Sequence, residues 1–312
     1  MERMLGEGPD RVSVRRLDSH ADAAATVARA AEEGCAFVIG GIGDKEAIVV
    51  ADAAETAAVP AVVLGQWPDG RKREWVVWAR TPRQEAMTAM ARHLAAAGLN
   101  KAWILGEDTA FGRAAAAGFK AGFTSASGEV TVERFGPPGA DAQKTASEFG
   151  RQVADARGKC EPVVLFLTGD FLSSRRLVPF LEFYGAVPRS PPNCPGVVIA
   201  GTPLFHDPRA VSRSGDSLVG ARFSDIRIVR PPEGVDAAGT LDAEVCDAAG
   251  LLASVLAAGR VAERPVIRDR MAAAKWSGCT GDLHVEEGRV VGREIGIFTI
   301  TRGGIEPWTS SD

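Results

Sequence analysis

The segment Glu32–Gly65, EEGCAFVIGGIGDKEAIVVADAAETAAVPAVVLG, contains one full cycle of the pattern that organises the chain. A short apolar run, Ala36–Ile39, ends in glycines. An alanine-rich stretch follows at Lys45–Ala57, and a second apolar run lies at Ala61–Leu64. The short apolar runs predict strands and the alanine-rich stretch predicts a helix. This order predicts a βαβ unit with parallel strands.

The same alternation continues on both sides of this segment. The other predicted strands are short apolar runs: Val12–Leu17, Glu74–Trp78, Lys101–Leu105, Val130–Phe135, Pro162–Leu167, Gly196–Ala200 and Ala221–Ile226. The other predicted helices are amphipathic or alanine-rich: Ala21–Glu33, Pro82–Ala97, Gly112–Ser125, Asp141–Asp155, Phe171–Tyr184, Ala237–Ala258 and Pro265–Ala274. We therefore expect an α/β protein with open parallel sheets and helices on both faces of each sheet.

The last third of the sequence has a different character. After the long helix Ala237–Ala258, the stretch from Trp276 to Gly304 alternates apolar and polar residues with glycines between the runs, which predicts antiparallel hairpins. The pattern as a whole predicts two lobes. The first comprises residues 1–80 plus 228–292, and the second comprises residues 81–227 plus 293–312.

Composition excludes several classes of protein. The 312 residues are 46% hydrophobic and 24% charged, as in soluble globular proteins, and the net charge of -4 provides no basic surface for nucleic acid. No apolar run is long enough to cross a bilayer, so we expect no direct membrane insertion. The N-terminal stretch has no apolar signal region. A cytosolic protein and a mature or truncated secreted protein both fit this pattern.

The five cysteines form no C-x-x-C pair, which argues against a zinc or thioredoxin-like site. Cys160 and Cys194 each precede a predicted strand. They are either a disulfide between parallel neighbours or buried free thiols. His206 and His284 are isolated in the sequence, so we expect no metal site.

The glycines of GGIGDKEA resemble a nucleotide-binding turn, but the pattern is incomplete. If G-x-G-x-x-G begins at Gly41, its third glycine position is occupied by Glu46. Asp44 and Glu46 complement the dipole of the following helix and would repel a phosphate. We therefore expect no nucleotide and no other cofactor. Ser173 and Ser174 lack a G-x-S-x-G context, and no catalytic constellation is recognisable. The sequence thus predicts a protein that is not an enzyme.

Candidate binding residues follow the predicted strands, because ligands of open α/β sheets lie at the carboxyl ends of the strands. Those of the first lobe are Ile42, Gly43, Asp44, Gln66 and Trp67, and those of the second lobe are Thr109, Phe111, Thr168, Asp170 and Thr202. Several have structural alternatives. Asp44 and Asp170 are also candidate helix N-caps. Trp67 is either a ring that stacks on ligand or a cover over a surface loop, and Phe111 is either a cleft or a core residue.

Four stretches in order resemble the type I periplasmic binding proteins, the branched-chain-amino-acid-binding group of transport receptors. The first is Glu32–Gly65, with its strand, small-residue loop, helix and "VP" before the next strand. The second is Trp78–Phe123, with an Arg at a strand end and "FG" where the family has "YG". The third, Ala243–Gly259, is similar to the family's "AYDA" helix, and the fourth, Trp276–Arg289, to its glycine hairpin. The resemblance covers about Val12 to Trp308.

This resemblance implies two Rossmann-like lobes joined by three crossovers, with ligand held between them. The family begins with a strand and helix ahead of the segment that aligns with Val12–Leu17, where this chain has Met1–Arg11. The resemblance thus implies a truncated chain or an altered first sheet. In the relatives the first-lobe loop offers hydroxyls and N–H groups to a ligand carboxylate. The negatively charged Asp44 side chain would repel a ligand carboxylate, and it suits a cationic or polyhydroxylated ligand. Phe111 keeps the ring of the family's Tyr and lacks its hydroxyl.

The resemblance also implies function. It favours a solute-binding protein of the periplasm or cell envelope, with a small-molecule ligand and an ABC-type transporter as partner. The alternative is a protein-interaction module like the activators of penicillin-binding proteins. The RTPRQEA stretch (Arg80–Ala86) resembles the sequence of that branch of the family. The missing hydroxyls of the cleft loops favour this alternative.

Overall fold

The computed structural model describes residues 22–67, 72–137, 139–157, 161–187, 196–207, 211, 216–231, 239–258 and 263–308. The chain divides into two compact units, each built from separate parts of the sequence. Unit 1 comprises Met1–Pro82 and Ile226–Glu294, and unit 2 comprises Arg83–Asp225 and Ile295–Asp312. The predicted lobes have their boundaries after residues 80, 227 and 292.

Unit 1 is built on a sheet with the strand order β1-β2-β3-β11-β10-β9. The strands are β1 (Val38–Gly40), β2 (Ala61–Val63), β3 (Val76–Trp78), β9 (Lys275–Gly278), β10 (Gly281–Glu286) and β11 (Arg289–Val291). The first three strands pair in parallel, and β3 also pairs in parallel with β11. The hairpins β9–β10 and β10–β11 are antiparallel. The predicted glycine hairpin is therefore confirmed.

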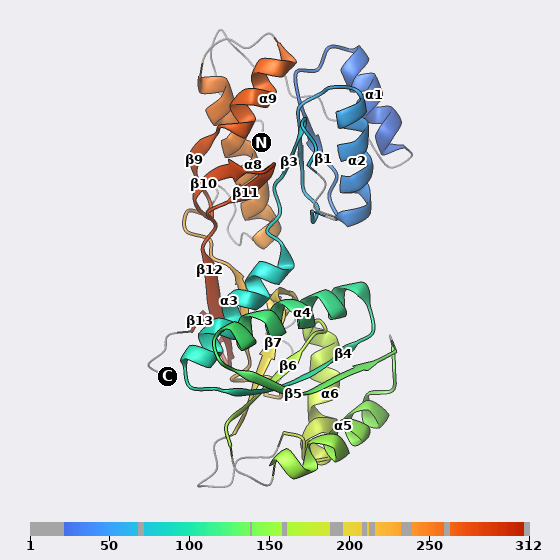
Figure 1. The fold of residues 1–312 in the computed structure, drawn as a ribbon, viewed down its shortest axis with the longest axis vertical. Coiled ribbons are helices and arrows are strands. Elements are labelled where there is room, and N and C mark those ends of the chain that lie inside the picture. The colour runs from blue at the N-terminus through green and yellow to red at the C-terminus, as the bar shows by residue number, and fades with distance from the viewer. Residues whose placement is uncertain are drawn as a thin grey trace. The chain divides into compact units, whose positions relative to one another are not determined.

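Helices cover both faces of the unit 1 sheet (Figure 1). On one face α1 (Ala23–Glu32) and α2 (Asp44–Thr56) contribute to a cluster that includes Val27, Val50 and Trp78. On the other face α8 (Thr240–Ala257) and α9 (Arg264–Ala272) contribute to a second cluster that includes Leu251 and Ile267. The β2 strand is buried throughout, as its unbroken apolar sequence requires.

Unit 2 is built on a sheet with the strand order β13-β12-β8-β7-β6-β4-β5. The strands are β4 (Lys101–Glu107), β5 (Glu129–Gly136), β6 (Val163–Leu167), β7 (Val197–Gly201), β8 (Arg222–Ile226), β12 (Ile295–Thr301) and β13 (Gly304–Pro307). The strands from β8 to β5 in this order are parallel, and β12 and β13 form an antiparallel hairpin. The α/β fold class with mostly parallel sheets is thus confirmed.

Two helix pairs sandwich the unit 2 sheet (Figure 1). The pair α3 (Arg83–Ala96) and α4 (Ala110–Ser125) packs on one face, and the pair α5 (Ala142–Arg157) and α6 (Phe171–Phe183) packs on the other. Glycines allow α3 and α4 to approach closely. A Cβ atom on Gly122 would lie 2.4 Å from the carbonyl oxygen of Thr88. A short 3-10 helix, η2 (Pro203–Phe205), follows β7.

Within the described residues, each predicted helix and strand corresponds to an observed element, with ends that differ by a few residues. Gly34, Gly98 and Gly185 follow helix ends with φ of +79°, +86° and +70°, the left-handed conformation that favours glycine. The predicted strand Val12–Leu17 lies outside the described residues.

A disulfide joins Cys246 on α8 to Cys279, which lies between β9 and β10. Sequence reasoning considered Cys160 and Cys194 instead, and both lie outside the described residues. Cys35 is a free thiol. Across the ranges that the structure describes, no helix is long and apolar enough to span a bilayer.

Candidate functional site

The predicted binding residues of the first lobe come together at the carboxyl edge of β1 and β2. The Gly43 N–H donates to the carbonyl of Leu64 at 3.3 Å. The Asp44 carboxylate accepts a hydrogen bond from the N–H of Gln66 at 3.1 Å. Tight packing of α2 against β2 fixes both loops, because a Cβ on Gly65 would lie 2.2 Å from the Cβ of Ala47. Ile42 remains 56% exposed at the tip.

The structure corrects the capping role considered for Asp44. Gly43, with φ of +94°, is the N-cap of α2, and Asp44 is the first residue of the helix. The Asp44 side chain therefore bonds across to Gln66 and does not cap its own helix. Asp44 and Glu46 still complement the helix dipole, since both lie in the first turn.

Gln66 and Trp67 also contact other parts of unit 1. The Gln66 side-chain amide donates to the carbonyl of Thr81 at 3.0 Å. The guanidinium of Arg289 lies over the Trp67 ring, with its central carbon 4.5 Å from the ring centroid. One face of the indole is thus engaged by a cation within the unit, an arrangement worth about 0.5–1 kcal/mol at exposed sites.

A buried network of charges, which the sequence analysis missed, contacts the residues that follow β3. Asp247 of α8 is fully buried and pairs with Arg293, with 3.0 Å between Oδ2 and Nε. The same carboxylate accepts from the Thr280 hydroxyl at 2.6 Å and from the Thr280 N–H at 3.2 Å. Arg293 also donates to the Ala79 carbonyl and the Thr81 hydroxyl.

A second buried carboxylate one helical turn earlier extends this network. Glu244 is 1% exposed, pairs with Arg80 at 2.9 Å, and accepts from the Thr81 N–H at 3.0 Å. The sequence contains a signal for both carboxylates. Glu244 and Asp247 have i, i+3 spacing within an otherwise apolar helix face, and charged residues at such positions are rarely buried without partners.

The network ties together the three chain segments at the unit boundaries. Ala79–Thr81 leads to the first boundary and bonds to Arg293 and Glu244, while Arg293 itself leads to the last. At the middle boundary, the Arg227 N–H donates to the Glu294 carbonyl at 2.8 Å. In unit 1, therefore, α8 holds the first and last segments by side-chain contacts, and the middle segment pairs with the last through this backbone bond.

In unit 2, three of the predicted binding residues serve as caps. Thr109 accepts from the Gly112 N–H at 2.9 Å at the start of α4. Asp170 accepts from the Ser173 N–H at 2.7 Å at the start of α6, which confirms its predicted capping role. Thr202 caps η2 and donates to the Gly169 carbonyl at 3.0 Å. The hydroxyl of Thr202 therefore links the carboxyl ends of β6 and β7.

Thr168 differs from these three residues because its buried hydroxyl has no hydrogen-bond partner among the described residues. The residue is 1% exposed. Glycines provide its space: a Cβ on Gly106 would lie 2.0 Å from the Thr168 hydroxyl oxygen, and one on Gly112 would lie 3.1 Å from it. A buried unsatisfied hydroxyl costs about 1–3 kcal/mol.

Phe111 is partly buried in the first turn of α4 and not in the core. The Arg83 guanidinium carbon lies 5.2 Å from the centroid of its ring. The ring thus takes part in a cation–π contact between α3 and α4. Its predicted contact with ligand stays a prediction.

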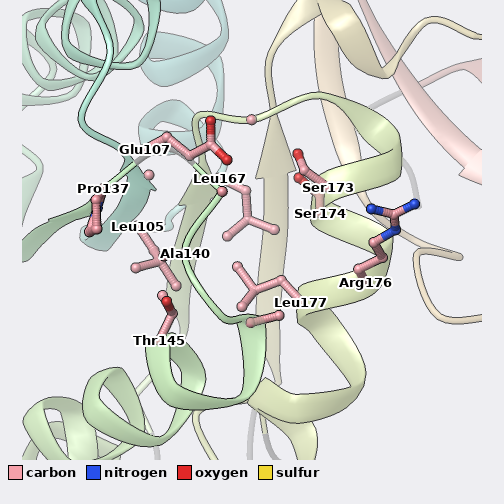
Figure 2. Close-up of a pocket in the computed structure, with 15 residues that line it drawn as sticks. Leu105, Glu107, Pro137, Ala140, Thr145, Leu167, Ser173, Ser174, Arg176 and Leu177 are labelled. Carbon is pink, nitrogen blue, oxygen red and sulfur yellow. The ribbon is translucent and has the colours of Figure 1, made fainter.

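A pocket of about 220 Å³ lies in unit 2 at the carboxyl ends of β4, β5 and β6, between the starts of α5 and α6 (Figure 2). Leucines from β4, β6 and α6 form its apolar part, and Glu107, Thr145, Ser173 and Ser174 are among its polar lining. None of the predicted binding residues lines it. The sequence analysis considered Ser173 and Ser174 only as nucleophiles.

The described residues contain no group of three or more His, Cys, Asp or Glu side chains arranged to hold a metal ion. His206 pairs with a carboxylate that lies 19 residues away in the sequence. Its Nδ1 lies 2.6 Å from the Asp225 carboxylate, and its ring lies 5.5 Å from that of Phe223, measured between centroids. The pair binds η2 to β8 inside unit 2.

Comparison with known proteins places these features in context. A sequence model of the family described as periplasmic binding protein matches residues 17–174. No curated protein matches the chain. The structure of a putative branched-chain amino acid ABC transporter from Rhodospirillum rubrum is 19% identical, with a TM-score of 0.77 over 96% of this chain and 88% of that one.

Two further solved structures have a similar fold. An ABC transporter solute-binding protein from R. palustris, in complex with benzoate, is 17% identical with a TM-score of 0.69 and covers 98% of this chain and 87% of its own. A leucine-binding protein from Thermotoga maritima is 16% identical with a TM-score of 0.70 and covers 96% and 88%. These likenesses confirm the two-lobed periplasmic-binding-protein fold.

Proposed function

Because this chain belongs to the periplasmic binding protein family, we propose that it is a non-enzymatic solute-binding protein for an ABC-type transporter. A small polar molecule would be captured between the lobes, in the periplasm or at the cell envelope. The observation that carries this proposal is the family match. The fold supports it, because the structure of the putative branched-chain amino acid ABC transporter aligns with 96% of this chain. Related structures with benzoate and with Leu support a small-molecule ligand.

The residues proposed to contact the ligand are the strand-end candidates of each unit. In unit 1 these are Ile42, Gly43, Asp44, Gln66 and Trp67, and in unit 2 they are Thr109, Phe111, Thr168, Asp170 and Thr202. The unpartnered Thr168 hydroxyl supports this proposal, because a buried polar group without a partner gains from a ligand that supplies one. Asp44 would favour a cationic or hydroxylated ligand over an amino-acid carboxylate.

The proposal is tested with the purified full chain. Small molecules released on denaturation are identified by mass spectrometry, and thermal unfolding is followed with a panel of amino acids, benzoates, polyols and amines. A true ligand at 100 times its Kd is expected to stabilise the protein by about 2.7 kcal/mol. Small-angle scattering with that ligand should report a more compact particle. No released molecule, no stabilisation and an unchanged scattering curve would contradict the proposal.

Matched variants locate the site. Asp44→Asn and Phe111→Ala are expected to weaken the ligand found in the screen, since they alter one candidate group in each unit. Asp216→Asn changes an exposed carboxylate of unit 2 that pairs with Arg302. Asp216 does not directly follow any strand that carries a candidate binding residue. That control should bind normally. Equal affinity in all three variants would place the ligand elsewhere.

The second candidate function is a cell-envelope protein-interaction module. An exposed apolar surface on α6 favours it: Leu172 is 45% exposed, Phe180 36% and Phe183 80%. Contiguous exposed apolar patches of more than a few hundred Å² mark interaction sites. Scattering with the screened molecules separates the two functions, because an interaction module shows no ligand-induced compaction. Phe183→Ser would then abolish binding to the partner without affecting thermal stability.

A further inference from the structure

The pocket of unit 2 has two chemically distinct ends. Figure 2 shows Leu105, Leu177 and Ala140 in its lower part together with the Thr145 hydroxyl, and Leu167 above them, so that this end is mostly apolar. At the other end, the Glu107 carboxylate and the hydroxyls of Ser173 and Ser174 lie on facing sides of the opening. An apolar part with a few polar groups at one end is the usual composition of a small-molecule site.

The polar end carries negative charge. In the described part of the chain no side chain pairs with the Glu107 carboxylate, whereas its neighbour Asp108 is paired with Arg113 at 2.8 Å. Arg176 lines the pocket, but its guanidinium points away from the interior in Figure 2. The Asp170 carboxylate is engaged at the start of α6. The starts of α5 and α6 add positive partial charge, but the Glu107 carboxylate is a full charge, so a cation is the complementary charge beside it.

The serine hydroxyls are positioned to accept hydrogen bonds. The Ser173 hydroxyl donates to the Asp170 carbonyl at 3.1 Å, which commits its proton and leaves its lone pairs available. Ser174 is 2% exposed and lies one residue further along the same turn. A primary ammonium group has three donors, which matches one carboxylate and two hydroxyls.

The volume limits the size of the apolar part. At about 220 Å³ the pocket is smaller than the sites of drug-sized ligands, which are roughly 300–1,000 Å³. It is larger than the cavity of about 150 Å³ that holds benzene in an engineered protein. One ring with a short arm is thus the expected size.

We propose that this pocket binds a small primary amine with an apolar body, of the arylalkylamine class, with the ammonium on Glu107 and the ring among Leu105, Leu167 and Leu177. The site goes beyond the proposed solute cleft, because residues of unit 2 alone form it and it shares none of the ten candidate residues. Binding there requires no contribution from unit 1.

The test uses 2-phenylethylamine and isothermal titration calorimetry on the full chain. The wild-type protein should bind it, and 3-phenylpropanoate, of similar size and opposite charge, should not bind. Glu107→Gln should weaken the amine by at least about tenfold, the loss expected for a hydrogen-bonded charge. Asp108→Asn, a change at the adjacent carboxylate outside the pocket, should leave the affinity unchanged.

A second variant makes the test independent of Glu107. Ala140→Leu adds three carbon atoms at the pocket wall and should abolish binding by filling the space. Its thermal unfolding and circular dichroism establish that it folds. No amine binding by wild type, equal binding of the acid, or unchanged affinity in Glu107→Gln or in folded Ala140→Leu would each overturn the proposal. The solute of the cleft should make the particle more compact. Amine binding that leaves the scattering curve unchanged therefore distinguishes this site from the solute cleft.

Discussion

The carboxyl edges of the two sheets differ in how their polar groups are satisfied. In unit 1, Asp44, Gln66, Thr81, Asp247 and Arg293 bond to one another or to neighbouring backbone. In unit 2, three strand-end side chains act as caps, but no described residue bonds to the buried Thr168 hydroxyl, and Glu107 lines a pocket. The polar groups of the unit 1 edge are thus already engaged within the protein. The unit 2 edge retains groups that a ligand can satisfy.

The largest expected effect is the loss of the buried ion pair in unit 1. Asp247→Asn keeps the shape of the side chain but leaves the Arg293 guanidinium, 2% exposed, without its counter-charge. We expect a destabilisation of about 3–5 kcal/mol, the usual result of breaking a buried pair. Denaturant unfolding measures it. The matched control in unit 2, Asp216→Asn, breaks an exposed pair and should cost less than about 1 kcal/mol.

The difference in destabilisation between Asp247→Asn and Asp216→Asn tests whether the unit 1 network stabilises the fold. If Asp247→Asn costs no more than Asp216→Asn, the unit 1 network does not stabilise the fold. The side-chain contacts of Glu244 with Arg80 and Thr81 would then remain as the candidate for holding the first boundary segment.

The disulfide should have the next largest effect, because it fixes the helix turn that carries Asp247 to the loop that carries Thr280. The cysteines are 33 residues apart, and closing a loop of that size stabilises by about 3.7 kcal/mol in the chain-entropy relation. Reduction, or the double variant with Cys246→Ala and Cys279→Ala, should lower the denaturation midpoint accordingly. Cys35→Ser serves as a thiol control with an unchanged midpoint. An equal midpoint in oxidised and reduced protein would contradict this prediction.

Local sequence patterns were sufficient to predict the elements and several caps. Asp170 begins α6 as expected, and Gly34 and Gly98 follow helix ends, because these features depend on residues only a few positions apart. The partners of Asp247 and Cys246 were not predictable in this way. They lie more than thirty residues along the chain, and only the packing of α8 against the hairpin brings them together.

The capping role of Asp44 failed as a prediction for a related reason. The residue type at a helix start predicts an N-cap, but Gly43 takes the cap position with a positive φ. Asp44 then finds its partner on the next strand-end loop. The pocket of unit 2 was missed because it combines residues from three strands and two helices, none of which forms a recognisable motif.

A smaller loss of stability is expected at Thr202 on the unit 2 edge, where the hydroxyl has hydrogen-bond partners. It is fully buried, donates to the Gly169 carbonyl at 3.0 Å and accepts from the Leu204 N–H at 3.3 Å. Thr202→Val preserves the branched shape and leaves both groups unpaired. We expect a loss of about 1–2 kcal/mol in the free energy of unfolding, measured in denaturant. A neutral result would mean that both backbone groups find other partners.

Thr168→Val is the matched change at the unsatisfied hydroxyl, and its expected effect has the opposite sign. Valine keeps the shape that fits against Gly106 and Gly112 and removes the unpaired oxygen. The ligand-free protein should gain up to about 1 kcal/mol, since the unfolded chain alone satisfies that hydroxyl. If Thr168 binds the solute as proposed, the same variant should lose affinity for the solute found in the screen. A destabilised Thr168→Val protein would mean that the hydroxyl is already satisfied, and the contrast between the two edges would then rest on Glu107 alone.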